Sequence, residues 1–338
     1  MRKFKILTVI CSLIMCIFLA EVATRAYYFN KLTTNQLILS RDPDLIYEHR
    51  PSISFTNIYG IKTKYNSLGF SGEEIMAKKA GTLRMLGIGD SIMDAPHLNE
   101  DKKFLHIIAQ ELKEDTEKDV EIINAAVGGY NTWQELAMIK EKGLAIKPDL
   151  IIVGICLNDF NSSKPVLSKV LFSNRIGENY RDGSKARYFN SLYQRSDFYK
   201  FIYDFFSNSK RKMYTKEGFL SYAKSYNIGI TNEEFRKWCH PFNEMVDLAQ
   251  SNKIEILFVI FPLQGQVMNR EMFSYKDLSD FFTRIKAHYI DLMGEFNKAD
   301  VEGKALYREK DIIHPNEYGY QLAAMSIAKY ILDNKMLK

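Results

Sequence analysis

The pattern of apolar and polar residues changes twice along the chain and divides it into three parts. Residues 1–30 contain a long apolar run, residues 31–80 are polar and interrupted by proline and glycine, and residues 81–338 alternate between strand-like and helix-like patterns. The third part is long enough to bury a sizeable core. We therefore expect a signal anchor or transmembrane helix, a small β-rich collar or linker, and one large α/β domain.

Residues 81–338 predict alternating strands and helices. Apolar runs with little polar alternation are typical of strands covered on both faces, and they lie at 82–89, 120–127, 148–156 and 253–261. Apolar residues at helical spacing predict helices at 102–115, 132–142, 232–251, 275–288 and 316–333. This alternation predicts a three-layer α/β/α fold with a mainly parallel central sheet. In such sheets, ligands bind beyond the carboxyl ends of the strands.

The apolar run at residues 6–20 follows Arg2, Lys3 and Lys5. It is shorter than the roughly 20 residues of a membrane-spanning helix. Continued to the aromatic residues 27–29, however, the segment approaches a full span. An uncleaved anchor is the first interpretation, and a cleaved signal peptide or a buried helix is the alternative. Because the basic start should stay in the cytoplasm, we expect the remainder of the chain outside it.

Residues 31–80 are polar, yet they carry many large apolar side chains. Short alternating runs at 52–58 and 60–65 predict strands. The large apolar residues are Phe55, Ile58, Tyr59, Leu68 and Phe70. They are too many for a free tether. A collar packed on the domain is therefore expected, with a surface linker as the alternative.

Residues 161–230 form an insertion that interrupts the alternation of strands and helices. They hold thirteen Lys and Arg against five Asp and Glu, a surplus larger than the net charge of +5 of the whole chain, and they are rich in aromatic residues. One interpretation is a helical insertion with packed aromatics and solvated charges. The other is a lid or platform that meets anionic glycans or lipid head groups. A nucleic-acid partner is not expected because it conflicts with export.

Ser91 and His314 are candidates for nucleophilic chemistry. Ser91 directly follows the first predicted strand, and His314 stands three residues after Asp311, before the last predicted helix. Serine is a weak nucleophile at neutral pH, so it needs a base and a third group that orients the base. Asp311 can orient His314 from the same turn of backbone. Each motif alone has a structural explanation, such as a helix N-cap for Ser91.

Two other strand ends carry groups suited to binding an oxyanion. Gly129 follows the second strand and Asn158 follows the third. A glycine lets a backbone N–H approach closely, an asparagine supplies a side-chain amide, and the N–H of Ser91 adds a third donor. Gly128 is the alternative to Gly129. The coincidence of these groups at neighbouring strand ends predicts an acyl-transfer site.

With these motifs the chain resembles the SGNH hydrolase superfamily, also called GDSL esterases/lipases, and its membrane-anchored bacterial members. The four blocks of that family resemble residues 89–91, 124–129, 157–159 and 311–314, in the right order. One position departs from the pattern, because Cys156 stands where the third block usually has glycine. A disulfide between Cys156 and Cys239 is one interpretation of these cysteines, and two isolated buried thiols are the other.

The resemblance implies a flavodoxin-like fold and a role for each site residue. Ser91 is the expected nucleophile, with Asp311 and His314 completing the triad. Ser91, Gly129 and Asn158 are the expected oxyanion hole. No metal and no cofactor are expected, since the histidines lack the spacing of a zinc motif. The missing Gly-x-Ser-x-Gly elbow is evidence against the α/β-hydrolase fold.

The function implied by the resemblance is a serine carboxylester hydrolase at the bacterial cell membrane. Its expected substrates are acylated envelope glycans or small lipid esters, cleaved through an acyl-enzyme, with the catalytic domain outside the cytoplasm. A secreted enzyme is expected if the first segment is cleaved. A polysaccharide O-acyltransferase with the same triad, or an inactive glycan-binding protein of the same fold, is the alternative. The sequence does not determine the oligomeric state.

Overall fold

The computed structural model describes residues 2–33, 36–156, 198, 232–269, 275–309 and 311–337. Apart from Phe198, the insertion predicted at 161–230 lies outside these residues, and so does Asn158. The described ranges contain the five strands given below and three of the four motif blocks. They therefore suffice to test the predicted fold and most of the predicted site.

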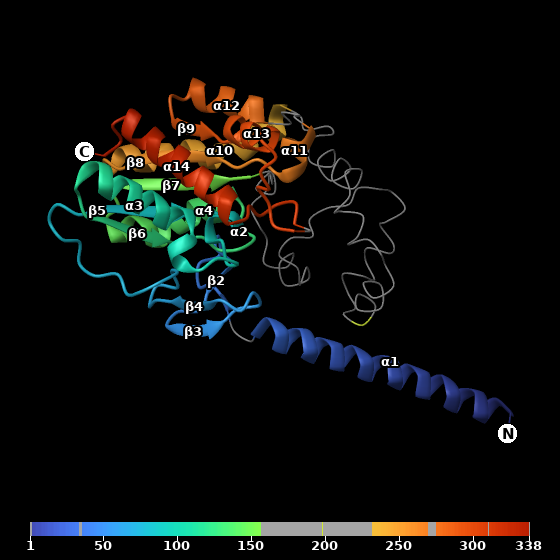
Figure 1. The fold of residues 1–338 in the computed structure, drawn as a ribbon. Coiled ribbons are helices and arrows are strands. Elements are labelled where there is room, and N and C mark those ends of the chain that lie inside the picture. The colour runs from blue at the N-terminus through green and yellow to red at the C-terminus, as the bar shows by residue number, and fades with distance from the viewer. Residues whose placement is uncertain are drawn as a thin grey trace.

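A five-stranded parallel sheet forms the centre of the domain (Figure 1). Its strands are β5 (Leu83–Ile88), β6 (Val120–Asn124), β7 (Leu150–Ile155), β8 (Glu255–Ile260) and β9 (His288–Asp291). They lie in the order β6-β5-β7-β8-β9, and all four pairings are parallel. This is the flavodoxin-like order, in which the direction of strand addition reverses between β5 and β7. The predicted parallel sheet is confirmed.

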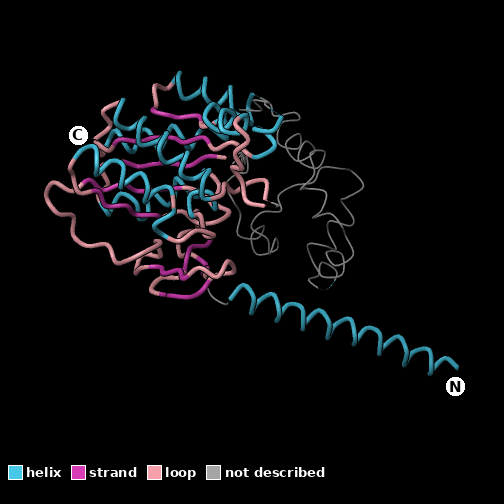
Figure 2. Tube along the Cα trace, viewed as in Figure 1, coloured by secondary structure: helices cyan, strands magenta, loops and turns pink. Residues whose placement is uncertain are grey.

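Helices cover both faces of this sheet, as Figure 2 shows. Right-handed crossovers place the helix between β5 and β6 opposite to those between β6, β7 and β8. Accordingly α3 (Phe104–Thr116) packs against α14 (Glu317–Asp333), and α4 (Thr132–Met138) packs against α10 (Asn232–Ser251). Shorter helices complete the layers: α2 (Ser91–Asp94), α11 (Gln264–Asn269), α12 (Tyr275–Arg284), α13 (Met293–Val301) and the turns Glu100–Lys102, Ile139–Gly143 and Leu144–Ile146.

The core lies between the sheet and its helices. Every residue of β5 and β7 is buried, as expected for central strands of a parallel sheet. An aromatic cluster packs α10 and α12 onto β8, with Phe258 and Phe282 stacked at 4.5 Å between ring centroids and Phe242 edge-on to both. Burial of each such ring contributes about 2–3 kcal/mol. The apolar runs of the sequence thus form the packed core that holds the strand ends in place.

Two antiparallel hairpins precede the sheet in the chain and form, with their connections, the collar (residues 36–80). They pair β1 (Leu37–Leu39) with β2 (Tyr47–His49), and β3 (Ile53–Thr56) with β4 (Lys62–Tyr65). The strands expected at 52–58 and 60–65 are therefore present. Leu45, Tyr47 and Phe70 are buried, whereas Ile58 is 86% exposed. The expectation that Ile58 packs on the domain is wrong, since it lies at the tip of the β3–β4 turn.

The first helix, α1 (Arg2–Thr33), extends away from the domain (Figure 1). Its apolar side chains are exposed, among them Leu13, Ile14 and Phe18. Within the described part of the chain, no helix reaches the length and apolarity needed to cross a membrane. The signal anchor stays a prediction.

The helix predicted at 275–288 is wrong in its last part. Helix α12 ends at Arg284, and residues 288–291 form β9, the edge strand of the sheet. Lys286 adopts a left-handed conformation with φ +56°, and the N–H of Ala287 donates to the carbonyl of Phe282, which is the bonding that ends a helix. With only four residues, β9 was too short to show a strand period in the sequence.

Candidate active site

Ser91 lies where the chain leaves β5 and enters α2. Asp90 caps this helix, because its carboxylate accepts a hydrogen bond from the N–H of Ile92 at 2.8 Å. Gly89 is needed here, since a Cβ at that position would overlap the side chain of Met93. Ser91 is thereby fixed beyond the carboxyl end of β5, next to the point where the strand order reverses. Ligands bind at this point in flavodoxin-like sheets.

Ser91, His314 and Asp311 form a continuous chain of hydrogen bonds. His314 Nε2 lies 2.9 Å from Ser91 Oγ, and His314 Nδ1 lies 2.9 Å from Asp311 Oδ2. A carboxylate only accepts, so Nδ1 carries the proton and Nε2 is left to accept from the serine hydroxyl. The structure therefore brings together the three residues that the sequence singled out at opposite ends of the domain.

Asp311 is held in place by its own turn of backbone. Its Oδ1 accepts hydrogen bonds from the N–H groups of Ile313 and His314, both at 3.0 Å. Burial alone raises the pKa of Asp311, but the hydrogen bonds and the charge of His314 outweigh burial and hold the pKa well below its usual range. Asp311 consequently stays ionised and keeps orienting the imidazole.

The glycine loop after β6 lies against Ser91. A Cβ on Gly128 would stand 3.8 Å from the Cβ of Ser91, and the N–H of Val127 donates to the carbonyl of Gly89 at 3.1 Å. Gly129 has φ +83°, a conformation that glycine adopts without strain. Within the described residues, the N–H groups of Ser91 and Gly129 meet no acceptor. Both donors are available to a substrate oxygen.

The third expected donor, Asn158, lies outside the described residues. Cys156 is the last described residue before it, and its thiol donates to Asp90 Oδ2 at 3.7 Å. The departure from the family's glycine thus has a structural role beneath the nucleophile turn. Two residues earlier, Gly154 packs directly on the side chain of Met93. Cys156 and Cys239 are both buried and no disulfide joins them, so the disulfide interpretation is wrong.

Sequence reasoning missed three residues that border the triad. The guanidinium of Arg308 donates to Asp311 Oδ2 at 2.9 Å and lies 4.7 Å from the ring centroid of Tyr59 in the collar. The ring of His97 lies 5.9 Å from that of His314, and its Nε2 donates to the carbonyl of Pro315 at 3.0 Å. Burial lowers the pKa of His97 to about 4, so this ring is neutral at pH 7. No spacing in the sequence marked these positions.

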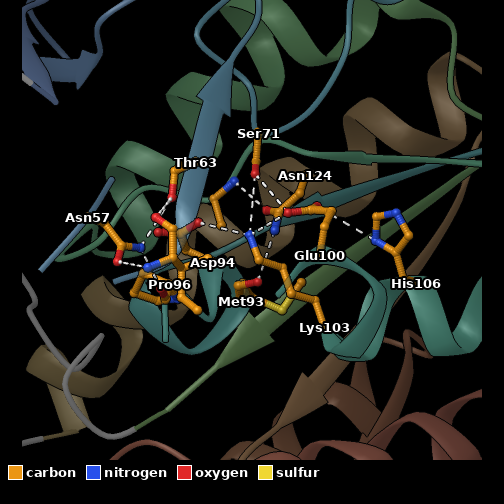
Figure 3. Close-up of polar contacts among 12 residues, drawn as sticks. Asn57, Thr63, Ser71, Met93, Asp94, Pro96, Glu100, Lys103, His106 and Asn124 are labelled. Carbon is orange, nitrogen blue, oxygen red and sulfur yellow. Dashed lines mark hydrogen bonds and ion pairs between the residues drawn. The ribbon is translucent and has the colours of Figure 1, made fainter. Parts of the chain in front are cut away.

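A buried lysine connects the nucleophile helix to the collar, as Figure 3 shows. Lys103 Nζ lies 3.9 Å from Asp94 Oδ1 and 2.9 Å from Glu100 Oε2, and it donates to Ser71 Oγ at 3.3 Å. Burial raises the pKa of Asp94 to about 6, although the charge of Lys103 opposes this rise. The N–H of Ser71 also donates to the carbonyl of Asn124, at the end of β6. Lys103 therefore stands where the collar, α2 and β6 meet.

In the described ranges, no group of three or more His, Cys, Asp and Glu side chains is arranged to hold a metal ion. The structure places four of the predicted site residues together. They are Ser91, His314 and Asp311, joined in one chain of hydrogen bonds, and Gly129, in the loop whose Gly128 lies against Ser91.

Comparisons with solved structures find distantly similar chains. A mutant of Axe2, an acetylxylan esterase from Geobacillus stearothermophilus, is 13% identical with a TM-score of 0.45, and the alignment covers 76% of this chain and 96% of that one. A lipolytic G-D-S-L protein from Desulfitobacterium hafniense is 14% identical with a TM-score of 0.41, over 73% and 98% of the two chains. No curated protein matches the sequence.

The match to a whole family is more extensive. Residues 88–322 match the family model described as GDSL-like lipase/acylhydrolase, and this segment contains Ser91, Gly129, Asp311 and His314. The match spans more than half of the sequence. The chain therefore belongs to the GDSL-like lipase/acylhydrolase family and is an SGNH-type serine ester hydrolase.

Proposed function

We propose that this chain hydrolyses carboxylic esters of acylated envelope glycans or small lipid esters through an acyl-enzyme on Ser91. The observation that carries the proposal is the hydrogen-bonded chain from Asp311 through His314 to Ser91 Oγ, with 2.9 Å at each step. It joins a nucleophile, a general base and an orienting carboxylate at one strand end. The basic, aromatic composition of residues 161–230 favours a glycan or an anionic lipid surface as the carrier of the ester.

The proposed mechanism follows from the roles of these groups. His314 Nε2 takes the hydroxyl proton as Ser91 Oγ attacks the ester carbonyl, and the carbonyl oxygen becomes an oxyanion. The N–H groups of Ser91 and Gly129, with the side chain of Asn158, donate to that oxyanion. Its collapse breaks the bond to the alcohol, which leaves with the proton from His314. Water, deprotonated by the same imidazole, then attacks the acyl-enzyme and releases the acid.

An organophosphonate ester and an acetylated oligosaccharide test this proposal together. We expect the phosphonate to modify the wild-type chain and the Ser54→Ala control, and not the Ser91→Ala variant. Equal modification of Ser91→Ala and wild type, or none of wild type, contradicts the catalytic assignment and leaves an inactive glycan-binding protein. Release of free acetate supports hydrolysis. Transfer of the acetyl group to a second sugar instead identifies a polysaccharide O-acyltransferase.

We also propose that α1 (Arg2–Thr33) anchors the chain in the bacterial cell membrane, with the catalytic domain outside the cytoplasm. The support is the uncharged run at residues 6–20 after three basic residues, together with the exposed apolar side chains of this helix. In cells that express a C-terminally tagged chain, we expect the tag in the membrane fraction after a carbonate wash, on a chain of full mass. A shorter tagged chain in the medium would identify a cleaved signal instead.

A further inference from the structure

Two tyrosines hold the glycine loop beside Ser91. Tyr47, in β2 of the collar, donates its hydroxyl hydrogen bond to the carbonyl of Gly128 at 3.3 Å. Tyr130, the residue after Gly129, donates in return to the backbone carbonyl of Tyr47 at 2.5 Å. The two rings pack edge-to-face, 5.2 Å apart, and both are buried. The residues before and after Gly129 are therefore both hydrogen-bonded to Tyr47.

The bond from Tyr47 acts on the peptide that carries the N–H of Gly129. A peptide unit is planar, and its C=O and N–H point in opposite directions. A donor that fixes the carbonyl of Gly128 therefore also fixes the direction of the N–H of Gly129. This N–H meets no acceptor within the described residues, and its loop lies against Ser91. It is thus free to donate to an oxyanion whenever its direction is right.

The loop needs such a restraint because glycine itself restricts the backbone very little. Gly129 has φ +83°, and two adjacent glycines have no Cβ to limit rotation of the peptide between them. An oxyanion donor is effective only when it is held in position before the charge develops. A hydrogen bond on the carbonyl side is a direct way to reduce this freedom without filling the substrate's space.

Tyr47 is itself held firmly. The side-chain amide of Gln134, at the start of α4, donates to the carbonyl of Leu45 at 2.8 Å, which keeps the collar against this helix. Burial raises the pKa of Tyr47 far above its usual value of 10, so the hydroxyl remains a donor throughout the range in which enzymes work. The restraint on Gly128 consequently does not depend on pH near neutrality.

We propose that Tyr47 is a positioning residue that aims the N–H of Gly129 at the oxyanion, which makes the collar a working part of the active site. The inference rests on the proposed ester hydrolysis at Ser91. Loss of a whole oxyanion donor costs about 10²–10³ in kcat. Loss of its restraint should cost less, about tenfold, because the donor remains and only its orientation is freed.

The test compares Tyr47→Phe with Tyr65→Phe, which removes the hydroxyl of another buried collar tyrosine. With p-nitrophenyl acetate we expect kcat to fall about tenfold in Tyr47→Phe, with KM and the pH profile unchanged, and phosphonate labelling of Ser91 to slow in parallel. Tyr65→Phe should retain wild-type values. Thermal unfolding of each variant provides the check on folding.

Two outcomes would contradict the role of Tyr47 and leave the proposed ester hydrolysis intact. In the first, wild type is active and Tyr47→Phe has the same kcat as Tyr65→Phe. In the second, the KM of Tyr47→Phe rises while its kcat stays constant. If wild type itself neither hydrolyses the ester nor accepts the phosphonate, the proposed function and this inference fail together. Should Tyr47→Phe not fold, Tyr130→Phe replaces it, since it removes the return bond to Tyr47, and it must then show the same loss in kcat.

Discussion

The parallel sheet and the collar contribute to one site in different ways. The strand ends of the sheet supply the groups placed to react, with Ser91 after β5 and the glycine loop after β6. The collar supplies side chains that contact the neighbours of those groups, such as Tyr47 on Gly128 and Tyr59 on Arg308. The comparison teaches that the candidate reacting groups stand at the strand ends of the sheet, whereas some of the side chains that contact their neighbours come from the collar.

Two buried carboxyl groups of the α/β domain have different surroundings. Asp94 lies on the side of the collar and has Lys103 as a nearby cation. Glu135, on α4, is fully buried, and neither of its carboxylate oxygens has a hydrogen-bond partner among the described residues. A buried charge without a partner is costly, so burial favours the protonated form of Glu135.

Asp311→Asn should have the largest effect, a loss of about 10⁴ in kcat. The amide can donate to Nδ1, which favours the tautomer whose Nε2 carries a proton and cannot accept from Ser91 Oγ. Asp333→Asn is the control, because Asp333 pairs with Lys329 on the surface. Steady-state hydrolysis measures both variants. If Asp311→Asn loses no more than the control, the orienting role of this carboxylate is refuted.

Lys103→Met should lower the free energy of unfolding by about 3–5 kcal/mol at pH 7, because it leaves Asp94 and Glu100 without their buried cation. The pKa of Asp94 lies above its unfolded value, so the folded chain loses stability as pH rises from about 4 to about 6. In the variant this loss should continue above pH 6. Urea unfolding should therefore show that the free energies of unfolding of Lys103→Met and wild type differ less at pH 5 than at pH 7.

The control for this variant is Lys102→Met, whose lysine forms an exposed pair with Glu317. It should change stability by less than about 1 kcal/mol at either pH. Equal effects of the two substitutions would show that Lys103 is not the cation that joins collar and sheet.

Glu135→Gln should stabilise the chain at pH 7 by about 1–3 kcal/mol. Burial, and secondly the charge of Asp90, raise the pKa of Glu135 well above its usual range. The unfolded chain releases this proton above about pH 4.5 whereas the folded chain keeps it, so wild type loses stability as pH rises through that value. The glutamine does not titrate, and its advantage should disappear below about pH 4. A variant less stable than wild type at pH 7 would mean that the carboxyl has a partner there.

Arg308→Met should have the smallest effect, a decrease in kcat of at most about fivefold. Its ion pair with Asp311 is partly exposed, and such pairs contribute about 0–1 kcal/mol. Tyr59→Leu should give a similar or smaller decrease, because it removes only the ring on which the guanidinium lies. Ile58→Ala is the matched control on the same exposed turn. A hundredfold loss in Arg308→Met would instead make this residue part of the catalytic machinery.

The parts of the site that could be predicted from the sequence are those with a local pattern of apolar residues beside them. The strand before Ser91 was expected at 82–89 and lies at Leu83–Ile88, and the helix after His314 was expected at 316–333 and lies at Glu317–Asp333. A run of buried apolar residues is visible in sequence because both faces of a parallel strand are covered. The short edge strand β9 was missed because it is half-buried and carries no such run.

The sequence by itself determined the order of the longer strands and helices, because burial and backbone preference leave periodic traces along the chain. It also identified the motif residues, because their side-chain chemistry stands directly after the predicted strands or before the last predicted helix. The tertiary structure alone decided which other side chains support them. Tyr47 reaches Gly128 across 81 residues, and His97 reaches Pro315 across 218. Such contacts depend on the direction of each side chain after folding, and neither periodicity nor spacing records that direction.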